Sequence, residues 1–283
     1  MRLAFSTNAF RRYTLAEAIR GLAGLGYQGV EIMADVPHAF PPDLSLAARR
    51  DLARLLADCG LAVANINAFM LHALGDTYHP SWIDPDPARR RLRIEHTRAC
   101  LQLAADLGAA TISTEPGGPS GALPEAAALD LFREGLLELA ADARRLGVRI
   151  LIEPEPGLVI ETSAQYQAFV QDLDPAVFGL NFDLGHFFCV GEDPATLVRS
   201  FGDQLAHVHL EDIAADRRHH HLAPGAGAID LAGVLDALRE VGYAGFVTVE
   251  LYPYEERPLA VAAEALAFLS TWQAGGTRPL APV

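Results

Sequence analysis

Four apolar stretches in the second half of the chain each carry an ionisable side chain at or near their end. These are Glu153 after ILI, Asp183 after LNF, His209 within AHVHL and Glu250 after VTV. If the stretches are neighbouring strands, three carboxylates and an imidazole meet at one edge and are unfavourable there unless a cation lies between them. This mainly hard-oxygen donor set suits Mn²⁺, Mg²⁺ or Co²⁺, and Zn²⁺ also fits. The pattern therefore predicts one divalent metal ion bound by these four residues.

A less specific interpretation makes each of the four a separate core residue with its own salt bridge. That explanation usually holds for one carboxylate at a strand end, but four at matched ends favour a common site. His207 lies two positions before His209 and points the same way one layer deeper, so we expect an ordinary core histidine there.

The elements that would position these residues alternate regularly along the chain. Each apolar run of strand length precedes a stretch of helical period, and the strands of buried parallel sheets have such near-continuous apolar sequences. Gly26, Gly108, Gly147 and Gly242 stand between a helical stretch and the next strand, where a left-handed cap turns the chain back. Expected strands are 3–5, 29–33, 62–66, 110–114, 148–152, 178–182, 205–210 and 246–251, and expected helices are 14–25, 45–59, 87–107, 124–146, 163–173, a short one from 194, 231–241 and 259–272.

Eight strand–helix units in about 280 residues predict an α/β protein, a single-domain closed (β/α)8 barrel with its catalytic groups at the C-terminal strand ends. The alternative, an open doubly wound sheet, lacks a GxGxxG motif after the first strand. We expect the barrel over residues 1–273 and a flexible C-terminal tail over 274–283. The stretch 72–87 is long for a loop, and it is either a lid over the site or a packed surface loop.

Composition excludes several classes of protein. Of the 283 residues, 22 are Lys or Arg and 36 are Asp or Glu, and this net charge of −14 opposes binding to a nucleic-acid backbone. No apolar run is long enough for a membrane helix, and no secretory signal is visible. Three scattered cysteines without CxxC spacing indicate reduced thiols, so we expect a cytoplasmic protein. The basic run 89–93 on an expected helix indicates a solvated or subunit-facing surface, which leaves a homo-oligomer open.

Four motifs give the chain a recognisable resemblance. They are I-E-P at 152–154, F-D-L-G-H at 182–186, H-V-H-L-E-D at 207–212 and V-E-L at 249–251. The set resembles the xylose-isomerase-like TIM-barrel superfamily of sugar (phosphate) isomerases and epimerases, which includes D-tagatose 3-epimerase, hydroxypyruvate isomerase, inosose dehydratase and the type-IV apurinic endonucleases. The resemblance covers all eight units, is specific in the second half, and is generic in the first.

The resemblance implies roles for individual residues. Glu153, Asp183, His209 and Glu250 match the family's metal ligands, and His186 in D-x-x-H matches its substrate-contacting histidine. Glu153 and Glu250 also match the acid/base pair, one on each face of the substrate. In that mechanism the ion polarises a ketone, one glutamate removes the neighbouring proton, and the other returns one through an enediolate.

Other candidates depart from the family pattern. Arg217 stands later than the substrate-binding arginine of the epimerases, while Asn67 and Glu115 can reach sugar hydroxyls from the rim. His219-x-His221 occupies the place of an endonuclease D-x-H that binds extra metal ions, unless it is simply a solvated loop. Glu155 stands where relatives often carry an amide, which suggests a different substrate. The missing histidines on strands three and four leave a trinuclear nuclease site incomplete.

These residues favour a metal-dependent isomerase or epimerase of carbohydrate metabolism that acts on a ketose, an inosose or a related small molecule. The alternatives are a lyase or dehydratase with the same enolate chemistry and a multi-metal phosphoesterase. A barrel that binds sugars without turnover fits less well, because every matched ligand is present. The sequence does not choose between isomerase, epimerase and dehydratase.

Overall fold

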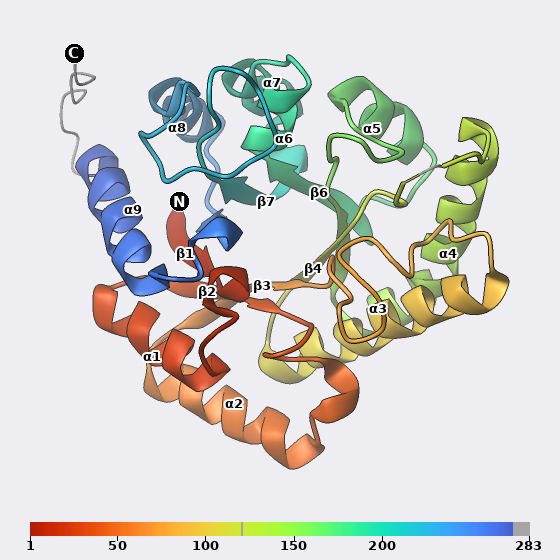
Figure 1. Cartoon of the computed structure of the whole chain (residues 1–283), viewed down its shortest axis with the longest axis horizontal. Coiled ribbons are helices and arrows are strands. Elements are labelled where there is room, and N and C mark those ends of the chain that lie inside the picture. Colours follow the sequence, from red (N-terminus) through yellow and green to blue (C-terminus); the bar gives the residue numbers. More distant parts are fainter. Residues whose placement is uncertain (120, 274–283) are drawn as a thin grey trace.

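The computed structural model describes residues 1–119 and 121–273, and within them the eight expected strands close into a parallel barrel in chain order (Figure 1). The first and last strands pair directly, with Phe5 opposite Val249. The strands are β1 Arg2–Ser6, β2 Gly29–Met33, β3 Ala62–Asn67, β4 Thr111–Thr114, β5 Arg149–Ile152, β6 Phe178–Asp183, β7 Leu205–Leu210 and β8 Phe246–Val249. This confirms the predicted fold class.

Helices surround the barrel (Figure 1). They are α1 Leu15–Leu25, α2 Leu46–Asp58, α3 Pro87–Leu107, α4 Glu125–Leu146, α5 Ser163–Val170, α6 Leu184–Cys189, α7 Pro194–Phe201, α8 Leu231–Glu240 and α9 Pro258–Gln273. Their apolar faces and the strands form one large core, and Ala4, Ala64 and Phe246 form a small separate cluster. Gly26 (φ 100°), Gly108, Gly147 and Gly242 all have the predicted positive φ. The proposed tail, 274–283, lies outside the described residues.

Short helix α6 was not predicted, and it matters for the site. Asp183 is its N-cap, because Asp183 Oδ1 accepts a hydrogen bond from the backbone N–H of His186 at 2.8 Å. The D-x-x-H motif is therefore a strand end followed at once by a six-residue helix. The start of this helix fixes the carboxylate and brings the His186 ring to the same rim.

One prediction about helix α3 was wrong in part. The run 89–93 is helical, Arg89 pairs with the buried Asp84, and the exposed Arg91 pairs with the exposed Glu138. Arg93, however, is 0% exposed and donates to the carbonyl oxygens of Ala68, Phe69 and Pro80. Its guanidinium thus anchors the segment between β3 and α3 from inside, rather than facing solvent or a partner.

The segment between β3 and α3 combines the two roles that its length suggested. Trp82 is buried, packs against Phe132 and donates from Nε1 to Thr114 Oγ1 at 2.9 Å. Tyr78, in contrast, lies over the strand ends and donates to Glu155 at 2.7 Å. The segment is packed at one end and covers the site at the other.

Among the described residues, no helix is long and apolar enough to span a membrane.

Candidate active site and metal centre

The four predicted ligands meet at the C-terminal end of the barrel. Each has a ligand atom in a group whose members all lie within 4.8 Å of one another. His209 is at the centre, because its Nδ1 lies 3.0 Å from Glu153 Oε1, 3.7 Å from Asp183 Oδ2 and 3.6 Å from Glu250 Oε2. All four side chains are buried. The four residues that the sequence pattern predicts at one edge of the sheet are thus neighbours in space.

Electrostatics at this point favour a cation. Burial opposes ionisation of Asp183, but the imidazoles of His186, His209 and His221 outweigh it and hold the pKa of Asp183 well below its ordinary value. Burial and the neighbouring carboxylates raise the pKa of Glu250 well above normal. Asp183 Oδ2 has no hydrogen-bond partner among the described residues. This buried oxygen lies beside the ligand atoms of the other three residues, and an oxygen in such a place is typical of a metal ligand. The site therefore suits a divalent ion.

Three asparagines hold the two glutamates in place. Asn8 Nδ2 donates to Glu250 Oε1 at 2.8 Å, and Asn67 Nδ2 lies 3.4 Å from the same oxygen. Asn181 Nδ2 donates to Glu153 Oε2 at 2.8 Å. Each glutamate therefore has one oxygen fixed by an amide and the other turned toward His209. Asn181 was not anticipated from the sequence, although its place two residues before Asp183 puts it on the same inward face.

A cavity of about 210 Å³ opens above the cluster. Its size and mixed lining fit a small polar molecule rather than a polymer. Burial raises the pKa of Glu155, in its wall, to about 7. Arg11 was not anticipated, because it follows β1 through a short turn without any motif. The lining residues are Asn8, Arg11, Asn67, Phe69, Met70, His72, Thr77, Tyr78, Glu153, Glu155, His186, His219, His221, Glu250, Tyr252 and Glu255.

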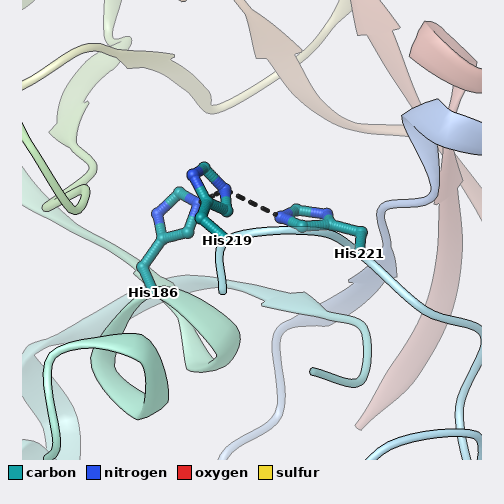
Figure 2. A group of neighbouring side chains, drawn as sticks. All are labelled: His186, His219 and His221. Atoms are coloured by element: carbon teal, nitrogen blue, oxygen red, sulfur yellow. Dashed lines mark hydrogen bonds between the residues drawn. The ribbon is translucent and has the colours of Figure 1, made fainter. Parts of the chain in front are cut away.

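Three imidazoles form a second cluster beside the first. His186 Nε2 lies 3.0 Å from His219 Nε2, which lies 3.2 Å from His221 Nε2 (Figure 2). Burial lowers the pKa of His219 to about 3 and that of His221 to about 4, which favours the neutral form of the ring that a metal ion requires. Asp212 shapes their loop by accepting hydrogen bonds from the backbone N–H groups of four residues, Ile213, Gly225, Gly227 and Ile229.

Two of the predicted substrate-binding residues lie away from this cavity. Arg217 stacks on Phe188, with its guanidinium carbon 4.1 Å from the ring centroid, and it is not part of the cavity lining. Glu115 is fully buried, and its nearest cation is Arg93 at 3.5 Å. His186 and Asn67, in contrast, both line the cavity. His207 is buried, as predicted, but it is not the ordinary core histidine expected, because its Nε2 has no hydrogen-bond partner among the described residues and lies 3.4 Å from Glu31 Oε2.

Comparison with known proteins identifies relatives over the whole barrel. A family model described as xylose isomerase-like TIM barrel matches residues 19–272. Inosose dehydratase of Lacticaseibacillus casei is 31% identical over 153 residues, 48% of this chain and 51% of that protein, so the match spans about half the relative's length. Fructoselysine 3-epimerase of Escherichia coli O157:H7 is 24% identical over 276 residues, 94% of this chain and 96% of the relative.

The solved structures agree on the fold. The IOLI protein, crystallised with a bound zinc atom, superposes with a TM-score of 0.78 at 21% identity and covers 96% of this chain and 99% of its own. At that identity the likeness concerns the barrel alone. Because the family model covers nearly the whole barrel, the chain belongs to the xylose isomerase-like TIM-barrel family.

Proposed function

We propose that the protein is a divalent-metal-dependent isomerase or epimerase of a small ketose, inosose or related polyol ketone. The observation that carries the proposal is the pair Glu153 and Glu250, which face one point from strands β5 and β8 together with Asp183 and His209. The cavity above them has room for a small polar molecule. An epimerase and a dehydratase among the similar proteins support this class of substrate.

Glu153, Asp183, His209 and Glu250 would hold the ion. When bound, a divalent ion supplies Lewis-acid polarisation of a carbonyl, which acidifies the adjacent C–H bond. Mn²⁺, Mg²⁺ and Co²⁺ suit the three carboxylates, and the zinc in the IOLI structure makes Zn²⁺ a further choice.

The two glutamates would exchange the substrate proton. Glu250 is held by Asn8 through Oε1, and its Oε2 is turned toward His209. Glu153 is tied to Asn181 through Oε2 and to His209 through Oε1. One carboxylate removes the proton next to the ketone, and the other delivers a proton to the resulting enediolate. His186, in the cavity wall, would orient a substrate hydroxyl.

A dehydratase is the second candidate, since inosose dehydratase is among the relatives. Its first step is the same removal of a proton next to a ketone. The reactions diverge afterwards, when a β-hydroxyl leaves instead of a proton returning. The two are therefore distinguished by product rather than by residues.

The test is proton exchange in heavy water. We expect the protein, reconstituted in turn with Mn²⁺, Co²⁺, Mg²⁺ and Zn²⁺, to incorporate deuterium next to the carbonyl of at least one ketose or inosose. The matching alditol (for a ketose) or inositol (for an inosose), which has no acidic C–H, is the control and should stay unlabelled. Loss of water from the labelled substrate assigns the dehydratase. No exchange with any ion across both substrate classes contradicts the proposal.

The three-imidazole cluster suggests a second ion, held by His186, His219 and His221. All-nitrogen donors favour Zn²⁺ or Co²⁺ over Mg²⁺. We expect two ions per chain by elemental analysis after Zn²⁺ reconstitution, and one after His219→Ala or His221→Ala. His220→Ala, an exposed neighbour in the same loop, is the control and should keep both. If the unmodified protein and His219→Ala each bind a single ion, the second site is refuted and His186 is a substrate contact only. If the unmodified protein binds two ions, phosphoester hydrolysis becomes worth assaying.

A further inference from the structure

We infer that Glu31, on strand β2, is a positioning residue that fixes the ring of His209 and the nitrogen on which that ring carries its proton. The inference rests on the proposed metal site. Glu31 is not among the four ligands, and it lies below the cavity rather than in its lining. It is 0% exposed, on the opposite side of the His209 ring from Glu153.

The contact between the two side chains is short and specific. His209 Nε2 lies 2.7 Å from Glu31 Oε2, while His209 Nδ1 faces Glu153, Asp183 and Glu250. A neutral imidazole has one N–H donor and one lone pair. With the proton on the nitrogen that faces Glu31, the lone pair points at the carboxylates where the ion would lie. The reverse tautomer would aim a proton at that point instead.

Glu31 is itself held by a polar network that crosses three strands. Asn65 Nδ2 donates to Glu31 Oε2 at 2.9 Å and to Ser113 Oγ at 2.9 Å. Thr111 Oγ1 donates to Asn65 Oδ1 at 2.8 Å, which fixes the orientation of the amide. His207 Nε2 lies 3.4 Å from the same Glu31 oxygen. These buried polar side chains of β2, β3 and β4 do not line the cavity, and the network explains their presence as supports for Glu31.

A carboxylate behind a metal-binding histidine raises the ring's basicity and selects its tautomer. Glu31→Gln keeps the size of the side chain but replaces the anionic acceptor with an amide. We expect this variant to bind Zn²⁺ or Mn²⁺ roughly 10–100-fold more weakly, measured by competition with a chromogenic chelator. Glu115→Gln is the matched control for metal affinity, since it removes another fully buried carboxylate outside the ligand group.

The outcomes separate the inference from the function on which it rests. If the parent protein binds no ion, the proposed function fails. If the parent binds and Glu31→Gln binds equally tightly, only the role of Glu31 is overturned. Should Glu31→Gln not fold, long-range ¹H–¹⁵N spectra of the Zn²⁺-loaded parent decide. The His209 nitrogen facing Glu31 is expected to carry a fixed proton, and a proton that exchanges between the two ring nitrogens would refute the inference.

Discussion

Replacing Glu250 by glutamine is expected to lower turnover of the proposed ketone substrate by about 10²–10⁴-fold, the usual contribution of a general acid or base. The amide cannot accept the substrate proton, yet its oxygen can still receive the hydrogen bond from Asn8 that now ends on Glu250 Oε1. The side chain therefore stays in place while its chemistry is removed. Turnover and deuterium exchange with the metal-saturated variant measure the loss.

A control variant tests whether the lower turnover comes from the loss of the acid/base group or only from the loss of a negative charge. Glu256→Gln removes a carboxylate from the same loop, but this side chain is exposed and pairs with Arg12 at the surface. The Glu256→Gln variant should turn over the substrate at the same rate as the unmodified protein. Metal content must be measured in parallel, because Glu250 is also a proposed ligand. Full turnover by a metal-loaded Glu250→Gln variant would remove Glu250 from the proton transfer.

The convergence of Glu153, Asp183, His209 and Glu250 was predictable from sequence, because it depends on where each residue stands relative to the end of its strand. Asp183 ends an apolar strand, and Glu153 and Glu250 directly follow one. A parallel barrel brings all such ends to one rim, whatever the details of packing. Strand boundaries and glycine caps were equally local, so the barrel itself could be predicted.

The partners of that set could not be predicted, because they depend on contacts between distant strands. Glu31 meets His209 across 178 positions, and Asn8 meets Glu250 across 242. Arg93 belongs to a run of arginines that looks solvated, and only the path of the preceding segment turns it inward. Arg217 stands later than the arginine of the family pattern, and its positive φ of 59° and its stacking on Phe188 direct it elsewhere. Pairings of this kind require the register of the whole barrel.

Replacing Asp183 by asparagine is expected to weaken binding of the proposed divalent ion by more than about 100-fold, beyond what loss of an outer-shell partner costs. The amide oxygen can still cap helix α6 by accepting the N–H of His186. The amide nitrogen then replaces Oδ2, which has no hydrogen-bond partner within the described part of the chain, and presents protons toward the cluster. The variant should thus fold like the parent yet lose its ion, as chelator competition and elemental analysis would report.

The control for this change is Asp35→Asn. Asp35 is also a fully buried aspartate at a strand end, where it accepts the backbone N–H groups of His72 and Ala73. Its loss should reduce the stability of the segment between β3 and α3 without changing metal affinity. If both variants lose the ion, general damage to the rim explains the result. If neither does, Asp183 is a helix cap alone, and the remaining donors, Glu153, His209 and Glu250, must hold the ion by themselves.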